Sequence, residues 1–198
     1  EEFYRERGIP WNLSILLHGI PGCGKTSFIK ALSNKTRRHL LDIDLSNIST
    51  TQDFLTAFNT ELFVDNFIPI DKRIIVLEDI DCMESKFLQV RSDTTEEGAA
   101  EESKKDDRMN LSCFLNTLDG IHEHHGRILI ATTNRMDVLD PAVLRRFNLK
   151  VMFKHLTLET AKEIVDNYYD ADISVPAIPD SLTGSRLTQL CMMYQNEP

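Results

Sequence analysis

The chain has 198 residues, enough for one large domain or for one domain with a small appendage. Hydrophobic residues make up 41% and charged residues 27%, a globular composition that allows a sizeable core. The formal net charge is -9, and because nucleic-acid phosphates repel an acidic surface, this charge disfavours non-specific binding to DNA or RNA. Paired arginines at 37–38 and 145–146 leave room for a local basic patch.

The four cysteines are scattered and form no CxxC pair: Cys23, Cys82, Cys113 and Cys191. This pattern favours free thiols in a reducing intracellular compartment, cytoplasmic or mitochondrial, over disulfides or a zinc site. No apolar run approaches the roughly 20 residues of a membrane span. The chain starts at Glu1 without Met or a signal-like segment, so a fragment of a longer protein is one expectation. Membrane association is then expected only through regions outside this chain.

Short apolar runs alternate with longer helix-like stretches along the first three quarters of the chain. The runs cover residues 13–18, 40–45, 73–77, 127–131 and 149–153. Runs of this length, rich in Ile, Leu and Val, are typical of strands buried on both faces of a parallel sheet. Helices are expected at residues 26–34, 51–59, 111–118 and 141–146. The alternation predicts an α/β fold with a central parallel sheet flanked by helices.

The pattern changes after Phe153. Residues 158–169 predict a helix with Thr157 as its N-cap, and residues 185–195 predict another after two prolines. We therefore divide the chain into an α/β domain, residues 1–153, and a small helical appendage, residues 154–198. The charged segment 92–108 lacks large apolar residues and is expected to be a surface loop, facing solvent or the channel of an assembly.

Residues 19–26, GIPGCGKT, match the phosphate-binding pattern G-x-x-x-x-G-K-[ST] between a predicted strand and a predicted helix. Glycines let backbone N–H groups converge on phosphate oxygens, and the helix N-terminus adds a positive dipole end. Lys25 is expected to reach the β- and γ-phosphates, and the Thr26 hydroxyl to bind Mg²⁺. The predicted nucleotide-binding residues are Gly19, Ile20, Pro21, Gly22, Cys23, Gly24, Lys25, Thr26 and Ser27.

Two adjacent carboxylates, Glu78 and Asp79, follow the apolar run 74–77. Side chains alternate along a strand, so these two are expected to point to different sides. One can hold the metal while the other polarises an attacking water. We assign Glu78 to Mg²⁺, with Thr26, and Asp79 to the water. The exchanged roles stay open, because the usual order in such ATPases is Asp followed by Glu.

Two further segments complete the predicted catalytic set. Residues 128–134 end in Asn134, whose amide can hydrogen-bond both a γ-phosphate and a water. Turns often contain Asn, so this residue is informative only because it follows the other two motifs in the right order. Residues 139–146, LDPAVLRR, end in Arg145 and Arg146. A guanidinium on a loop can stabilise charge on a transferring γ-phosphoryl group, in the same subunit or in a neighbour.

These four elements, in this order, resemble the AAA ATPases. The closer resemblance is to the subfamily typified by the mitochondrial AAA ATPase that assembles respiratory complex III. It lies in RGIP at 7–10, GCGKTSFI at 22–29, VLEDID at 76–81, LNTLDGI at 115–121 and LTQLCMMYQNEP at 187–198. The resemblance spans nearly the whole chain.

The resemblance implies ATP and Mg²⁺ as ligands, a helical lid that closes near Gly184 and Ser185, and a homo-oligomeric ring with ATP at its subunit interfaces. It implies that Asn134 senses the γ-phosphate and that Arg145 and Arg146 reach the neighbouring site. The family usually has Leu-Arg-Pro-Gly-Arg there, so the adjacent arginines put in doubt that both reach it. Residues 46–50 lack the aromatic with which unfoldase rings grip peptide, which disfavours threading of an extended chain.

The function predicted is ATP hydrolysis that remodels, chaperones or translocates a macromolecular substrate, expected to be a protein. A non-hydrolysing, nucleotide-gated assembly module is the alternative, and a nucleic-acid motor is disfavoured by the net charge. Trp11 either packs or stacks near the adenine. The histidines within 122–125 fit a solvated loop better than a metal site.

Overall fold

The structure, a computed structural model, describes residues 2–8, 11–63, 65–83, 109–119 and 125–194. Its centre is a parallel sheet in the order β2-β5-β6-β1-β7. The strands are β1 (Leu13–Gly19), β2 (His39–Asp42), β5 (Arg73–Leu77), β6 (Ile128–Thr133) and β7 (Leu149–Phe153). The predicted α/β fold is confirmed, and each predicted strand is present.

The register places the carboxyl ends of the three central strands along one edge of the sheet. In β1 and β6, Leu13 pairs with Ile128 and His18 with Thr133. In β5 and β6, Ile74 pairs with Ile128. Parallel strands in this register bring the segments that follow them to a common edge, where open α/β folds bind ligands.

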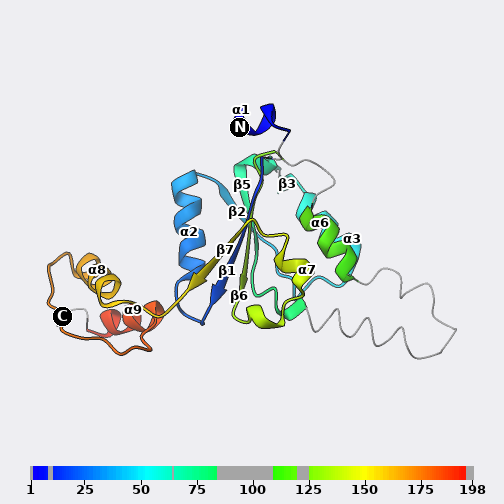
Figure 1. Cartoon of the computed structure of the whole chain (residues 1–198). Coiled ribbons are helices and arrows are strands. Elements are labelled where there is room, and N and C mark those ends of the chain that lie inside the picture. Colours follow the sequence, from blue (N-terminus) through cyan, green and yellow to red (C-terminus); the bar gives the residue numbers. More distant parts are fainter. Residues whose placement is uncertain (1, 9–10, 64, 84–108, 120–124, 195–198) are drawn as a thin grey trace, which may run out of the picture.

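Helices cover both faces of the sheet (Figure 1). α2 (Lys25–Thr36) lies on one face, and α3 (Thr51–Asn59), α6 (Leu111–Asp119) and α7 (Pro141–Leu144) lie on the other. The apolar pattern of the strands supplies a core on each side, because alternate side chains enter opposite layers. Leu16, Ile75 and Leu77 pack in the α3 layer, whereas Ile15 and Leu17 pack in the α2 layer.

The α3 layer is the larger core and contains four buried phenylalanines, Phe54, Phe58, Phe114 and Phe147. The Phe54 and Phe114 ring centroids lie 5.6 Å apart. Two buried arginines close this core at the amino ends of neighbouring strands. Arg73 donates to the Phe58 carbonyl at the end of α3, and Arg127 donates to the Leu118 carbonyl at the end of α6. Each guanidinium thus stabilises the negative end of a helix.

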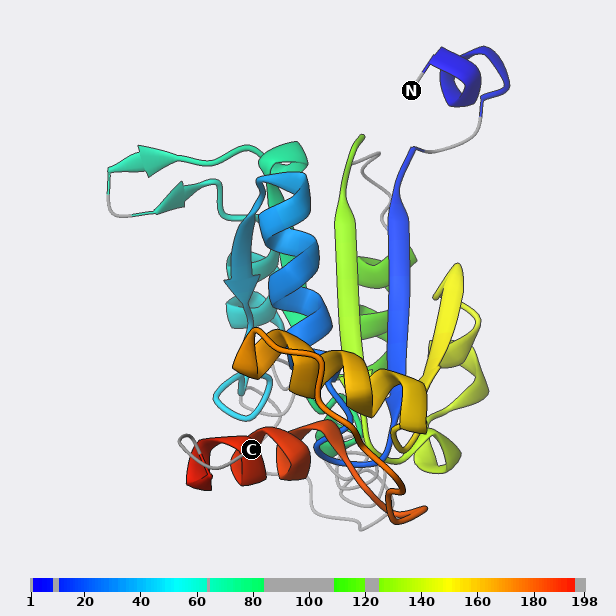
Figure 2. The same cartoon turned by 90° about the vertical axis from the view of Figure 1, so that its left-hand side faces the viewer.

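The last segment forms a separate helical layer at the carboxyl edge of the sheet, below α2 in Figure 2. It contains α8 (Leu158–Tyr169) and α9 (Gly184–Met193), and its own cluster is built from Ala161, Val165, Leu182, Leu187 and Cys191. The predicted cap of α8 is present, since the Thr157 side chain accepts from the Thr160 amide. We call this layer, residues 156–194, the lid.

Smaller elements complete the described chain. They are α1 (Glu2–Glu6), the hairpin β3 (Leu62–Phe63) and β4 (Asn66–Phe67), and the 3-10 turns η1 (Ile70–Lys72) and η2 (Met136–Val138). The hairpin projects from the sheet in Figure 2. No helix in the described ranges is long and apolar enough to cross a membrane. The charged segment 92–108 lies outside the described residues.

Strand β2 differs from its prediction. It ends at Asp42, although the apolar run continues to Leu45. The chain then turns: Asp44 accepts hydrogen bonds from the Ser46 amide and hydroxyl, while Leu45 and Ile48 enter the core. The later apolar residues therefore anchor a loop rather than extend the sheet.

Candidate active site

The phosphate-binding loop lies between β1 and α2, as the motif predicts. Its glycines take backbone conformations that side chains disfavour: Gly22 has φ 75° and Gly24 has φ 99°. Gly24 is also the N-cap of α2 and has no side-chain cap. The first amides of a twelve-residue helix therefore remain directed at the loop, where a phosphate can accept from them.

Lys25 connects the loop to the neighbouring strand. Its side-chain amine lies 2.9 Å from the Gly19 carbonyl and 2.7 Å from Oδ1 of Asn134. Asn134 follows β6, and its Nδ2 donates to Oδ1 of Asp79 at 3.2 Å. A chain of hydrogen bonds thus joins a cation, an amide and a carboxylate that lie far apart in the sequence.

The two adjacent acids meet different partners. Glu78 Oε1 accepts from the Thr26 hydroxyl at 3.0 Å. Asp79 has φ 48° because the chain turns directly after β5, and its amide donates to the Thr132 hydroxyl. The two acids point to different partners, as expected, but strand alternation is not the reason. β5 ends at Leu77, and the turn that follows it separates them.

Thr26 and Glu78 present hard oxygen donors next to each other. A hydroxyl and a carboxylate in contact suit Mg²⁺, which prefers oxygen ligands and keeps several waters. Among the described residues, no group of three or more His, Cys, Asp or Glu side chains could hold a metal without further ligands. A Mg²⁺ ion here would therefore complete its ligand shell with phosphate oxygens and water.

The pKa of Asp79 is raised above the ordinary 3.8, first by burial and then by the nearby carboxylates Asp81 and Glu78. Lys25 acts in the opposite direction. Asp81 is itself fixed, because its Oδ1 accepts from the Thr133 hydroxyl at 2.7 Å. Asp79 is thus a carboxylate with more affinity for a proton than a solvated one, which suits a group that polarises water.

The lid closes directly on the phosphate-binding loop. The Ser185 amide at the start of α9 donates to the Gly22 carbonyl at 3.0 Å. A Cβ on Gly22 would collide with the Ser185 hydroxyl. This contact leaves a cavity of about 970 Å³ between loop and lid. The residues of the loop and of the strand ends that line it are Pro21, Gly22, Cys23, Gly24, Lys25, Thr26, Ser27, Glu78, Asp79, Thr132 and Asn134.

The lid supplies a wall of the cavity that the sequence analysis did not name, apart from the pair Gly184 and Ser185. Leu156 and Ile164 provide apolar surface, and Thr160, Thr188, Gln189 and Met192 line the remainder. Residues 185, 188, 189 and 192 recur at intervals of three and four on α9, so they share one helix face. This helical spacing is visible in the sequence and could have identified these four residues as one face of the lid helix.

Three groups of predicted residues lie elsewhere. Gly19 and Ile20 line a neighbouring cleft on the β7 side of the loop. Arg145 is exposed, and Arg146 binds Asp119 through Nε at 2.9 Å and Nη2 at 2.7 Å. The Arg146 side chain is only 14% exposed. Neither arginine lines the cavity of its own chain.

Trp11 lies at the opposite end of the sheet and packs against Gly126, so it does not stack on a base in this cavity. All four cysteines are free thiols, as predicted. Cys23 belongs to the loop and donates to the Ile20 carbonyl. Of the predicted histidine loop, residues 122–124 lie outside the described chain.

Comparison with known proteins shows the family to which the chain is related. The family described as ATPase family associated with various cellular activities (AAA) matches residues 15–155. An AAA-ATPase of Arabidopsis thaliana is 34% identical over 87% of the chain and 36% of its own length. The mitochondrial chaperone BCS1 of Homo sapiens is 27% identical over 100% of the chain and 46% of its own length.

A relative from Acanthamoeba polyphaga mimivirus, the AAA family ATPase L572, is 30% identical over 86% of the chain and 95% of its own length. The chain thus spans less than half of the plant and human relatives and nearly all of the viral one. With a family match over most of the sequence, the chain belongs to the AAA family of ATPases.

Proposed function

We propose that this chain is one subunit of a homo-oligomeric ring that hydrolyses ATP between subunits and uses the energy to remodel, chaperone or translocate a protein. The observation that carries the hydrolytic part is the hydrogen-bonded path Lys25–Asn134–Asp79 beside the Thr26–Glu78 pair, all lining one cavity. The chaperone part is supported by the similarity to BCS1, which is named a mitochondrial chaperone.

In this proposal the ATP phosphates lie in the loop 19–26, with Lys25 against the β- and γ-phosphates. Thr26 and Glu78 hold Mg²⁺, which neutralises charge on the phosphate oxygens when bound. Asp79 polarises the attacking water, and Asn134 orients that water and the γ-phosphate. Glu78 rather than Asp79 is assigned to the metal because its oxygen contacts the Thr26 hydroxyl.

Besides Lys25, the charge that develops on the γ-phosphate calls for an arginine, and none of the described arginines lines the chain's own cavity. Arg145 is exposed at the end of α7, whereas Arg146 is held by Asp119. We therefore assign the arginine finger to Arg145 and a positioning role to Arg146. A guanidinium reaching a neighbour's γ-phosphate contributes about 10³-fold or more in turnover.

The proposed substrate class and compartment are supported by the similarity to BCS1, and the loop after β2 bears on how a substrate is held. The loop after β2 presents serine and asparagine, with Leu45 and Ile48 turned into the core, which disfavours gripping an extended peptide. We propose a protein substrate, no nucleic acid, and a reducing intracellular compartment, with the mitochondrion favoured by BCS1.

Steady-state ATP hydrolysis, measured against protein concentration with particle mass determined in parallel, tests the proposal. Turnover per subunit should rise as rings form and vanish in Asp79→Asn. Arg145→Ala should lose about 10³-fold, while Arg7→Ala, which removes an exposed arginine directly after α1, should match the wild type. Assembled rings that bind ATP without turnover would instead establish a nucleotide-gated module.

A further inference from the structure

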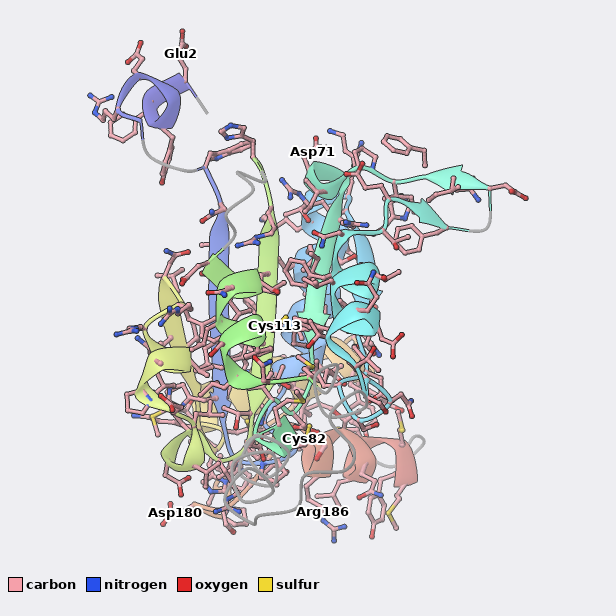
Figure 3. All side chains as sticks on the ribbon, turned by 90° about the vertical axis from the view of Figure 1, so that its right-hand side faces the viewer. Glu2, Asp71, Cys82, Cys113, Asp180 and Arg186 are labelled. Carbon is pink, nitrogen blue, oxygen red and sulfur yellow. The ribbon has the colours of Figure 1, made fainter. Side chains whose placement is uncertain are left out.

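A second cleft lies at the amino-terminal edge of the sheet, opposite the nucleotide cavity. Its residues lie within three positions of the starts of neighbouring strands: Trp11 comes before β1, Arg38 before β2, Lys72 before β5 and His125 before β6. The strand order β2-β5-β6-β1 brings these segments together. Figure 3 shows the separation from the lid, with Asp71 at the opposite end from Arg186 of α9.

The cleft has a volume of about 570 Å³, within the range of small-molecule sites. Its described lining carries three cations, Arg37, Arg38 and Lys72, and one carboxylate, Asp71. The chain as a whole has a net charge of -9. A cationic cleft on an acidic protein concentrates small anions locally while the remaining surface repels large polyanions.

Backbone hydrogen bonds of Gly126 hold two residues of the cleft, Trp11 and Arg38, in place. The Gly126 amide donates to the Trp11 carbonyl at 2.6 Å, and the Gly126 carbonyl accepts from Arg38 Nη1 at 2.5 Å. A Cβ at this position would lie 2.9 Å from the Trp11 ring and 3.0 Å from Cβ of Asp71. The indole and one guanidinium are therefore held in place before any ligand arrives.

The other cations are available to a ligand. Arg37 forms no ion pair or side-chain hydrogen bond with any described residue, and it stands at the exposed C-cap of α2 with φ 54°. Among the described residues, Lys72 pairs only with Asp71, at 3.1 Å, and both side chains are well exposed. Exposed pairs of this kind contribute little to stability, so an anion of higher charge can displace Asp71 from Lys72.

We propose that this cleft binds a phosphate group carried by a small polyphosphorylated molecule or by a lipid headgroup. Two neighbouring guanidiniums suit phosphate oxygens, which accept paired N–H bonds. The Trp11 ring supplies an apolar face beside them for the carbon frame of the ligand. The site is separate from the phosphate-binding loop and needs neither ATP nor a ring.

The only tryptophan of the chain lines this cleft, so its fluorescence reports on the site directly. Titration with inositol hexakisphosphate should change Trp11 emission saturably, and the apparent affinity should fall with salt. The double variant Arg37→Gln, Lys72→Gln should bind about a hundredfold more weakly, since it removes two charged groups whose hydrogen bonds contribute about tenfold each. The control, Lys30→Gln with Lys150→Gln, makes the same charge change outside the cleft.

Co-sedimentation with phosphatidylcholine vesicles, with and without phosphatidic acid, distinguishes the sources of the phosphate. Binding of the free probe supports a soluble ligand, and binding of the acidic vesicles alone supports a headgroup. The Trp11 response should persist in Lys25→Ala. The proposal is overturned by no binding in either arm up to about 1 mM, by equal loss in the control variant, or by a response that disappears in Lys25→Ala.

Discussion

Glu78 and Asp79 are neighbours in the chain but meet different partners in the site. Glu78 contacts the Thr26 hydroxyl, and Asp79 contacts the Asn134 amide. The turn after β5 produces this division, with Asp79 in a left-handed backbone conformation. Two adjacent acids can therefore hold a metal and polarise water without competing for one position.

This division predicts separable defects. Glu78→Gln should raise the Mg²⁺ concentration needed for nucleotide binding, because it removes the charged ligand. Asp79→Asn should leave Mg·ATP binding near the wild-type level and lower turnover by about 10²-fold or more, the scale of losing one group that acts on the reacting atoms. Fluorescent-nucleotide binding at varied Mg²⁺ and single-turnover hydrolysis measure the two effects. The opposite pattern would exchange the roles.

Asp79 also makes nucleotide-free stability depend on pH. Its pKa is raised in the fold, chiefly by burial, so the folded state holds the proton more tightly than the unfolded state. The stability this provides is present below the ordinary 3.8 and is lost as pH rises through the higher folded value. Asp79→Asn does not titrate, so its Tm should exceed the wild-type Tm by a margin that grows across that window. A margin independent of pH would contradict this.

At the scale of elements, α6 and α7 are joined by the Arg146–Asp119 pair, which is bidentate and mostly shielded on the arginine side. Arg146 also donates to the Ala142 carbonyl, and its own carbonyl accepts from Ser14 in β1. The segment that presents Arg145 is thus tied to two other elements. Without these contacts, the segment that carries Arg145 would be more mobile, and the guanidinium would be less well positioned.

Substitution of Arg146 should therefore reduce stability, whereas substitution of Arg145 should reduce turnover. Arg146→Ala should lower the free energy of unfolding by about 1–3 kcal/mol, because it removes charge-assisted hydrogen bonds. Arg145→Ala should leave stability within about 0.5 kcal/mol, as expected for an exposed side chain, while abolishing most turnover. Urea unfolding alongside ATPase assays separates them. Equal stability losses would remove the distinction.

The contact between loop and lid predicts a further effect. Gly22→Ala should weaken ATP binding, because its Cβ would collide with Ser185 and push α9 away from the loop. Gly8→Ala is a matched control: Gly8 also has positive φ, 60°, but a Cβ there has nothing within 4 Å. Both variants carry the backbone cost of about 1 kcal/mol. The difference between their ATP affinities, measured by calorimetric titration, should therefore report the collision with Ser185. Equal affinities in the two variants would show that the lid contact is unimportant.

Local patterns predicted most elements, because strand and helix signals are short-range. Helix α3 occupies residues 51–59 as expected, and the phosphate-binding loop lies between strand and helix. The hairpin β3–β4 was missed, since each strand has only two residues and no alternating pattern can develop. The partner of Arg146 was missed as well, because Asp119 lies 27 residues away and only the packing of α6 against α7 brings it close.

At the scale of the whole molecule, the cavity and Arg145, the proposed arginine finger, lie on different surfaces. The cavity is enclosed by the loop and the lid, and Arg145 stands on α7 on the other face of the sheet from α2 (Figure 1). A site on one surface and its missing cation on another fit a heterologous contact, in which each subunit completes the next and the series closes as a ring. On this proposal, the neighbouring subunit supplies the arginine that is absent from the cavity lining in the described part of the chain.

Complementation between two inactive variants tests whether each active site is formed by the loop of one subunit and the Arg145 of the next. Lys25→Ala lacks a working loop but keeps Arg145, and Arg145→Ala keeps the loop but lacks the finger. If the site lies between subunits, a randomly mixed 1:1 ring contains intact loop–finger pairs at about a quarter of its interfaces. Mixing should then restore ATPase activity to about a quarter of wild type. A mixture that forms mixed rings by mass, yet stays as inactive as either parent, would contradict the account.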